Sequence, residues 1–219
     1  MSEYLLSTSG LTKQFGHHKA VNNVDLHVKK GAIYGFIGRN GAGKTTFLKM
    51  ISGLSKPTDG EIQMFGYRNE ELKNVRSRIS CLIEAPGIYG NMSAYHNLAI
   101  KCRLFGINDS KYIENILKIV GLSEVGKKKT KHFSLGMKQR LGIGLALVGE
   151  PDLLVLDEPI NGLDPQGIAE IRDMLLRLKE EQNMTIIISS HILEELSKIA
   201  THYGIIHKGS LIQELTREE

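Results

Sequence analysis

The feature that most constrains the fold is a glycine-rich turn at residues 38–45, which read Gly-Arg-Asn-Gly-Ala-Gly-Lys-Thr. This order fits the pattern G-x-x-x-x-G-K-[ST]. The apolar run 32–37 before it predicts a buried strand, and Phe47, Leu48 and Ile51 after it have helical spacing. A turn between a strand and a helix directs backbone N–H groups and the positive end of the helix dipole at an anion. Because both flanking elements have the right type, a chance match is disfavoured, and the turn predicts a phosphate-binding loop.

The side chains of this loop indicate how a nucleotide is held. The Lys44 ammonium can reach the β- and γ-phosphates, and the Thr45 hydroxyl can ligate Mg²⁺. We expect the whole turn and the start of the helix to contact the nucleotide. The residues concerned are Gly38, Arg39, Asn40, Gly41, Ala42, Gly43, Lys44, Thr45 and Thr46.

Two acidic residues follow a second apolar run. Residues 153–156 are Leu-Leu-Val-Leu, which predicts a buried strand, and Asp157 and Glu158 come directly after it. In a parallel sheet the carboxyl ends of the strands form the ligand side. We expect Asp157 to hold Mg²⁺, directly or through a water molecule, and Glu158 to polarise an attacking water. The alternative, two solvated acids at a strand end, is weakened by the presence of the phosphate loop.

Strand and helix patterns alternate along the rest of the chain. Apolar patterns predict further strands at 24–28, 79–83, 185–189 and 203–207. Helical spacing predicts helices at 113–120, 168–178 and 192–199. The sequence pattern from 85 to 149 is mainly helical, and the lysine-rich run 127–131 predicts a solvated loop. This alternation predicts an α/β fold with a mostly parallel sheet covered by helices.

Composition excludes several other classes of protein. The chain has 219 residues, 41% hydrophobic and 24% charged, which are values typical of a globular domain. The net charge is only +4 and the aromatic fraction is 6% with no Trp, so we expect no nucleic-acid partner. No apolar stretch approaches the roughly 20 residues that a membrane span needs. Any membrane role must therefore act through a partner chain.

Three further motifs fall between and after these elements. They are Phe-Ser-Leu-Gly-Met-Lys-Gln-Arg at 133–140, Asn-Gly-Leu-Asp at 161–164 and Ser-His at 190–191. With the two earlier motifs, their order over about residues 4–213 resembles the ATP-binding subunit of an ABC transporter. The resemblance implies ATP and Mg²⁺ as cofactors and ATP hydrolysis coupled to transmembrane transport.

The same resemblance implies a particular architecture. The expected fold is a P-loop NTPase core with a mostly parallel sheet, an N-terminal antiparallel β part and an inserted helical subdomain. The chain is then a single ABC ATPase domain over 1–219. Residues 85–149 form the helical insert, and residues 1–84 and 150–219 form the nucleotide-binding core.

The resemblance also assigns roles to individual residues. Phe15 matches the aromatic residue that stacks on adenine, although a core aromatic is the alternative. Ser134 and Gly136 stand where the family signature contacts ATP held by the opposite subunit, and Asp164 matches the loop that crosses the dimer interface. His191 matches the histidine that contacts the γ-phosphate and positions the water.

Two positions depart from the usual pattern of the family. The usual signature Leu-Ser-Gly-Gly-Gln is replaced by Phe-Ser-Leu-Gly-Met, so Leu135 and Met137 remove a flexible glycine and an amide. Glu84 stands where the family usually has a glutamine, and its carboxylate can approach Mg²⁺ or the lytic water. The alternative for Glu84 is a solvated glutamate at a strand end. Both departures resemble the subgroup that serves bacitracin resistance and lantibiotic immunity or export.

The resulting hypothesis is the ATPase subunit of a membrane exporter that acts on a bacitracin- or lantibiotic-like peptide. Two copies, or this chain and a paralogue, are expected to hold ATP head to tail and to act on transmembrane permease subunits at the cytoplasmic face of a bacterial membrane. The alternatives are an exporter ATPase for another substrate and a soluble ABC ATPase of translation or DNA maintenance. The soluble types usually carry two cassettes or a long coiled coil, and this sequence has neither. A small-molecule P-loop kinase explains residues 38–45 but not the other motifs.

Overall fold

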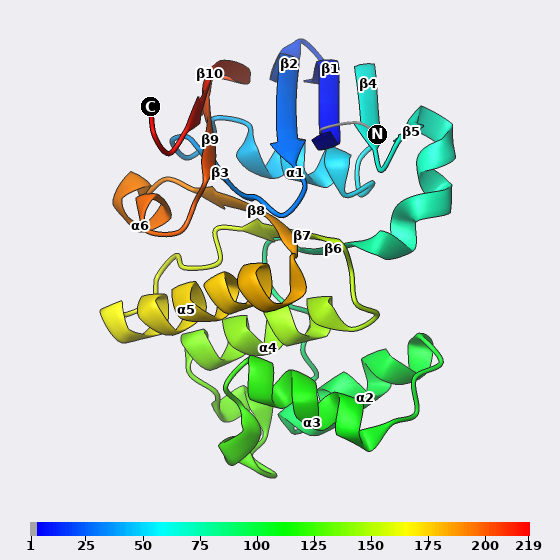
Figure 1. Ribbon diagram of the computed structural model, residues 1–219, viewed down its shortest axis with the longest axis vertical. Coiled ribbons are helices and arrows are strands. Elements are labelled where there is room, and N and C mark those ends of the chain that lie inside the picture. The colour runs from blue at the N-terminus through cyan, green and yellow to red at the C-terminus, as the bar shows by residue number, and fades with distance from the viewer. Residues whose placement is uncertain (1–3) are drawn as a thin grey trace.

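The computed structural model describes residues 4–219, so the first three residues of the predicted domain lie outside the described part. The described chain contains two sheets (Figure 1). The antiparallel sheet has the order β2-β1-β4-β5, formed by His18–Lys29, Tyr4–Phe15, Asp59–Met64 and Tyr67–Arg68. The second sheet has the order β10-β9-β3-β8-β7-β6, formed by Ser210–Thr216, His202–His207, Ile33–Ile37, Thr185–Ser190, Leu153–Asp157 and Ile79–Leu82. All its strands are parallel except β10, which confirms the predicted α/β class with an antiparallel part.

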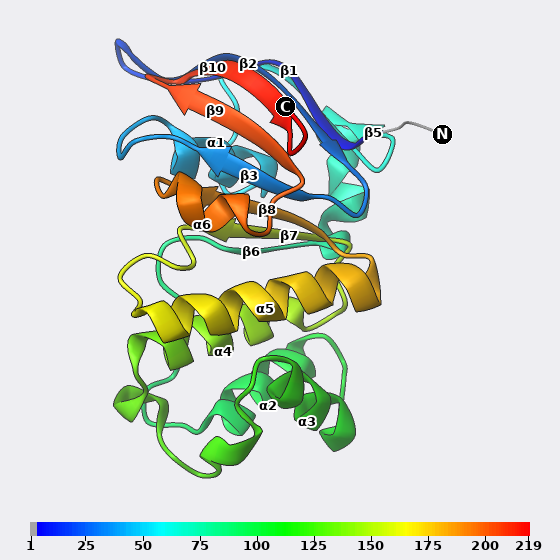
Figure 2. The same cartoon turned by 60° about the vertical axis from the view of Figure 1, so that its left-hand side comes forward.

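The helices pack in layers on these sheets. The α-helices are α1 (Lys44–Ile51), α2 (Ala94–Leu104), α3 (Ser110–Ile119), α4 (Leu135–Leu147), α5 (Pro165–Gln182) and α6 (Leu193–Ser197). The 3₁₀ segments are η1 (Asn69–Arg78), η2 (Ser123–Val125) and η3 (Thr130–His132). Helix α1 lies between the two sheets, α5 and α4 cover the other face of the six-stranded sheet, and α2 and α3 lie at the far end (Figures 1 and 2).

The central strand β7 explains why the six-stranded sheet is buried on both faces. Leu153 and Val155 belong to the core cluster that includes α1 and the antiparallel sheet. Leu154 and Leu156 belong to the cluster that includes α4 and α5. All four side chains are fully buried, and each contributes about 1.5–3 kcal/mol through removal of its apolar surface from water. The continuous apolar run in the sequence therefore reflects a strand with a core on each side.

The register of the parallel strands brings three motifs to one edge of the sheet. Asp157 at the end of β7 is paired with Ser189 on β8, and Ile37 at the end of β3 is paired with Ser190. Three motifs therefore lie side by side at this edge: the glycine-rich loop after β3, the acidic pair at the end of β7 and His191 after β8. This is the ligand edge expected for a parallel sheet.

Some elements differ from the sequence-based expectation. Strand β1 was not predicted, because register shifts interrupt its pairing with β2 and its buried residues do not alternate simply. Strands β4, β5 and β10 were also missed. The run 127–131 is not wholly solvated, since Thr130 is fully buried and its hydroxyl donates to the carbonyl of Tyr89. The division into a core and an 85–149 insert stays a prediction.

Candidate functional site

The glycine-rich loop has a backbone that only glycine can adopt at its most confined point. Gly43 is the N-cap of α1 and has a φ of 108°. A Cβ atom added there would lie 2.4 Å from the carbonyl oxygen of Ala20, and one added at Gly38 would lie 2.6 Å from that of Ile206. Arg39, Asn40 and Gly41 form the exposed tip of the loop. Packing from strands β2 and β9 therefore fixes the loop from outside and leaves its inner backbone free to face an anion.

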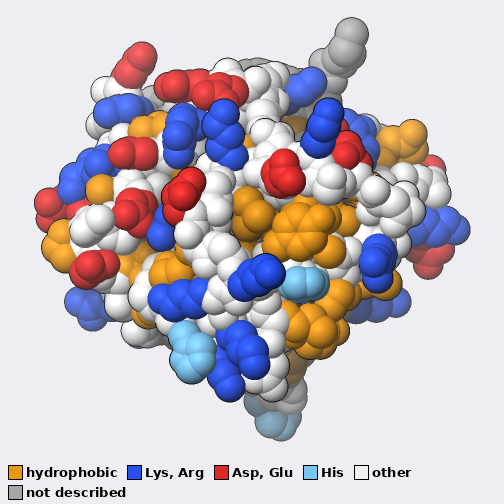
Figure 3. Space-filling model, turned by 90° about the horizontal axis from the view of Figure 1, so that it is seen from below, with side chains coloured by type: hydrophobic (Ala, Val, Ile, Leu, Met, Phe, Trp, Pro, Cys, Tyr) orange, Lys and Arg blue, Asp and Glu red, His pale blue; other side chains and the backbone are white. Residues whose placement is uncertain are grey.

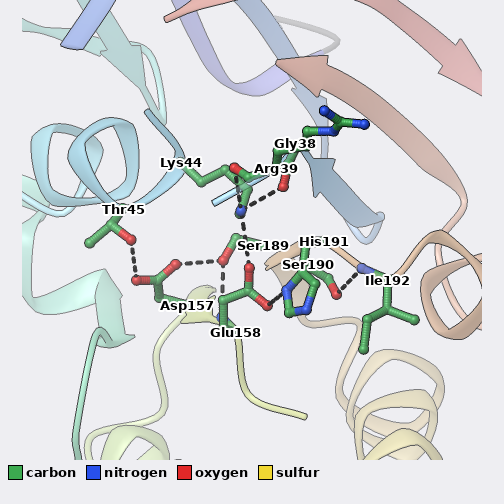
Figure 4. Close-up of polar contacts among 10 residues, drawn as sticks. All are labelled: Gly38, Arg39, Lys44, Thr45, Asp157, Glu158, Ser189, Ser190, His191 and Ile192. Atoms are coloured by element: carbon green, nitrogen blue, oxygen red, sulfur yellow. Dashed lines mark hydrogen bonds and ion pairs between the residues drawn. The ribbon is translucent and has the colours of Figure 1, made fainter. Parts of the chain in front are cut away.

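Lys44 is buried at the start of α1 and binds only oxygen atoms. Its Nζ atom donates to the carbonyl oxygens of Gly38 at 2.6 Å and Arg39 at 3.2 Å, and lies 3.1 Å from Oε1 of Glu158 (Figure 4). Its side chain is only 6% exposed. A buried ammonium surrounded by oxygen atoms is suited to binding phosphate oxygens at the same place.

Thr45 and Asp157 lie together as the sequence predicts for a Mg²⁺ site. The Thr45 hydroxyl donates to Oδ2 of Asp157 at 2.7 Å. One hydroxyl and one buried carboxylate are a donor set that fits Mg²⁺, which keeps several waters and takes phosphate oxygens instead of a full protein cage. No group of three or more His, Cys, Asp or Glu side chains suited to a metal occurs among residues 4–219.

Glu158 contacts both the phosphate loop and His191. Its Oε2 atom lies 2.9 Å from Nδ1 of His191, and its Oε1 atom faces Lys44 (Figure 4). The backbone of Glu158 is left-handed with a φ of 49°, which is unfavourable for a residue with a side chain. The structure thus gathers the three polar side chains that the sequence assigned to the γ-phosphate and the water.

Ser189 is a residue of this site that the sequence pattern does not single out. It is fully buried, donates to Oδ1 of Asp157 at 2.5 Å and accepts from the Glu158 N–H at 2.9 Å (Figure 4). The only signal in the sequence is a pair of serines at the end of a β-branched strand, directly before His191. Which of the two serines faces Asp157 depends on the strand register, which the sequence alone does not give.

Phe15 and Glu84 lie away from the contacts between Thr45, Asp157, Glu158 and His191. Phe15 ends β1 with 56% of its surface exposed, so the core-aromatic alternative is wrong. The Glu84 carboxylate lies after β6, is 67% exposed and pairs with Lys49 on α1. In the described part of the chain no hydrogen bond or ion pair joins Glu84 to Thr45, Asp157 or Glu158. Its assignment to catalysis and to Mg²⁺ stays a prediction.

The residues expected to act on an opposite subunit form a second group. Ser134 is the N-cap of α4 and accepts from the Met137 N–H, and Asp164 is the N-cap of α5 and accepts from the Gly167 N–H. Both are exposed. A Cβ atom added at Gly136 would lie 3.8 Å from the Leu163 side chain, so the two motifs adjoin. Within residues 4–219, neither Ser134 nor Asp164 forms a hydrogen bond or ion pair with the phosphate loop.

The geometry suits binding and hydrolysis of a nucleoside triphosphate. The loop and Lys44 hold phosphates, Thr45 and Asp157 fit a divalent cation, and Glu158 beside His191 can accept a proton from water. In residues 4–219 no helix combines the length and the hydropathy that crossing a membrane requires.

Comparison with known proteins agrees with this chemistry. The sequence profile described as "ABC transporter" matches residues 21–161. The chain is 49% identical to the bacitracin transport ATP-binding protein BcrA of Bacillus licheniformis, over 96% of this chain and 69% of that protein. It is 43% identical to the lantibiotic transport ATP-binding protein SrtF of Streptococcus pyogenes, over 96% of this chain and 90% of that protein.

Solved structures show the same fold. The cbiO1 subunit from Clostridium perfringens, part of the ABC transporter complex cbiONQ, superposes with a TM-score of 0.88 at 26% identity, covering 99% of this chain and 90% of that one. A nucleotide-free ATP-binding cassette from an ABC transporter superposes with a TM-score of 0.86 at 27% identity, covering 97% and 91%. This chain belongs to the ABC transporter family, as a transporter subunit that binds and hydrolyses ATP.

Proposed function

We propose that this subunit drives the export of a bacitracin- or lantibiotic-like peptide, or protects the cell against such a peptide. The observation that carries the proposal is the identity of 43–49% with transport proteins of both peptide classes over nearly the whole chain. The two departures from the usual family pattern, Leu135 with Met137 and Glu84, support the same subgroup.

The residue roles follow the contacts of the site. Residues 38–46 hold the phosphates of ATP, and Phe15 stacks on its adenine. Thr45 and Asp157 hold Mg²⁺, which neutralises charge on the phosphates when it is bound. Glu158 accepts the proton of the attacking water, and His191 orients Glu158 through their 2.9 Å contact. Glu84 joins them from its exposed position after β6.

The active assembly is a head-to-tail dimer with ATP between the subunits. Ser134, Gly136 and Asp164 are solvent-facing or half-exposed and adjoin one another, which supports a role toward a second subunit. They complete the site of the opposite copy, or of a paralogue. The dimer closes when it binds ATP and opens after hydrolysis, and this movement acts on the permease subunits.

The helical end of the molecule is the side that we assign to the permease. Exposed apolar side chains gather at this end beside lysine, arginine and histidine side chains, with acidic side chains along another edge of the patch (Figure 3). The exposed large hydrophobic side chains of the 85–149 insert include Tyr89 at 57%, Leu104 at 78% and Phe105 at 46% exposure. An exposed apolar cluster of this kind marks an interaction surface, and it fits a permease loop at the cytoplasmic face of a membrane. The Glu84 loop adjoins this insert in sequence and links it to the nucleotide.

Resistance measurements in cells test this proposal. Cells carry the subunit with the permease encoded beside it, and growth is measured in bacitracin, in a lantibiotic and in an unrelated antibiotic. The expected result is protection against a peptide antibiotic that disappears with Glu158→Gln, and no protection against the unrelated compound. Protection that persists in Glu158→Gln cells, or that is equal for all three compounds, contradicts the proposal.

A further inference from the structure

Ser189 lies where the two functional carboxylates leave the sheet. It is the fifth residue of β8, is paired with Asp157 across the parallel register and has no exposed surface. A serine hydroxyl has one hydrogen to donate and lone pairs to accept with. Here the hydrogen goes to Oδ1 of Asp157, and a lone pair accepts the N–H of Glu158 (Figure 4).

The bond to Asp157 fixes Oδ1, the carboxylate oxygen that does not contact Thr45. Thr45 donates to Oδ2 and Ser189 donates to Oδ1, so each oxygen of Asp157 has its own hydroxyl partner. The partner on α1 is the one assigned to Mg²⁺. Within residues 4–219 the partner on β8, Ser189, forms no hydrogen bond with the phosphate loop, so its bond to Asp157 orients the carboxylate without competing for the phosphates. Groups that orient a metal ligand in this way commonly affect metal binding strongly.

The bond to Glu158 supports a strained backbone. The left-handed φ of 49° at Glu158 persists only where neighbouring contacts hold it. Both the hydroxyl and the carbonyl oxygen of Ser189 accept from the Glu158 N–H, at 2.9 and 3.2 Å. The same backbone conformation directs the Glu158 side chain to Lys44 and His191.

We propose that Ser189 is a positioning residue for ATP hydrolysis, because one hydroxyl sets both the Asp157 carboxylate and the backbone of Glu158. The inference rests on the proposed roles of Asp157 in Mg²⁺ binding and of Glu158 as the base. It couples the two: the metal ligand and the base share one donor-acceptor group, so loss of that group affects both at once.

The chain offers a matched control on the same strand. Thr185 at the other end of β8 is also fully buried, and its hydroxyl accepts from the Gly31 N–H at 2.9 Å. Thr185→Val removes a buried hydroxyl and keeps the shape of the side chain. It therefore reproduces the structural cost of losing such a group, away from the nucleotide site.

The test compares Ser189→Ala, Ser189→Thr and Thr185→Val. Affinity for a fluorescent ATP analogue is measured in EDTA and in Mg²⁺, together with turnover and the unfolding temperature. Ser189→Ala should bind the analogue with wild-type affinity in EDTA. In Mg²⁺ its affinity for the analogue should be about tenfold lower than that of the wild type, and its turnover should also be about tenfold lower. Ser189→Thr keeps the hydroxyl and should restore both, and Thr185→Val should lose stability only.

The results separate this inference from the proposed function. An unchanged response to Mg²⁺ in Ser189→Ala, or an equal loss in Thr185→Val, overturns the positioning role. Should Ser189→Thr fail to fold, the comparison of Ser189→Ala with Thr185→Val decides alone. Asp157→Asn is measured in parallel, and if it keeps the full Mg²⁺ response, the proposed metal site fails and the inference fails with it.

Discussion

The Nδ1 atom of His191 lies 2.9 Å from the Oε2 atom of Glu158. The two residues follow neighbouring strands, β8 and β7, whose pairing at Ser189 and Asp157 sets their separation. The other carboxylate oxygen of Glu158 faces Lys44 at 3.1 Å. The candidate base is therefore oriented by groups from two different motifs, and its removal can be tested without loss of the phosphate loop.

Glu158→Gln should bind ATP but fail to turn it over. The amide keeps the size of the side chain and cannot accept the proton of the water, so hydrolysis should fall about 10²–10⁴-fold. Bound ATP should persist and hold two subunits together. Size-exclusion chromatography with Mg-ATP checks this, with EDTA and the exposed Glu180→Gln as controls. A monomer in Mg-ATP counts against both the base role and the dimer.

Lys44→Ala should weaken nucleotide binding and abolish turnover. The substitution removes the buried ammonium that binds the oxygen atoms of the loop and of Glu158. Calorimetric titration with ATP measures the effect, and Lys56→Ala, an exposed lysine outside the loop, is the control. Tight ATP binding by the Lys44→Ala protein would contradict the assignment of this loop.

Phe15→Ala should reduce the affinity for ATP and ADP alike, because adenine is common to both. Loss of one stacking contact costs on the order of 1–3 kcal/mol. The exposure of the ring means that fold stability should change little. Binding of both nucleotides is compared with that of Tyr67→Ala, another exposed aromatic of the antiparallel sheet. Equal affinities of the Phe15→Ala and wild-type proteins remove Phe15 from the adenine site.

The sequence predicts the parts of the site that depend on residue type and local spacing. The phosphate loop is recognisable because a strand, a turn with glycines at 38, 41 and 43, and a helix that begins at Lys44 follow one another directly. The two acids are recognisable because they come directly after an apolar run. The apolar pattern also predicts which strands are buried, as the continuous apolar run 153–156 does for β7. These features need no knowledge of distant residues.

The remaining features depend on contacts between distant segments. Ser189 acquires its role from the register of β8 against β7, and Glu84 acquires its partner, Lys49, from helix α1. Strand β1 was missed because its register shifts break the alternation that marks a half-buried strand. Contacts between segments far apart in the sequence, rather than propensity along the chain, determine all three.

Glu84 gives the last and sharpest test, because it departs from the usual residue of the family. Its carboxylate pairs with Lys49 and is 67% exposed. An exposed ion pair of this kind contributes only about 0–1 kcal/mol. The pair therefore holds the Glu84 carboxylate weakly, and breaking it costs little.

Two substitutions of Glu84 should separate a charge effect from the loss of any polar group. ATP affinity should change little in either, because the phosphate loop supplies most of the binding. Glu84→Gln restores the usual residue of the family, so part of the hydrolysis should survive. Glu84→Ala should lower turnover at least tenfold, or about 1.4 kcal/mol of transition-state stabilisation. Peptide resistance in cells that carry the permease should fall further than the ATPase rate, because the same loop leads into the helical insert.

Lys49→Ala is the matched variant, since it breaks the same ion pair and leaves the carboxylate in place. If Glu84 acts at the nucleotide, Lys49→Ala should keep wild-type turnover or exceed it, because the carboxylate is released from its surface partner. If the pair itself is what matters, both alanine variants should lose activity equally. ATPase rates of the purified subunits and resistance of the cells are measured together. Wild-type values of both for Glu84→Ala would show that this glutamate has no mechanistic role.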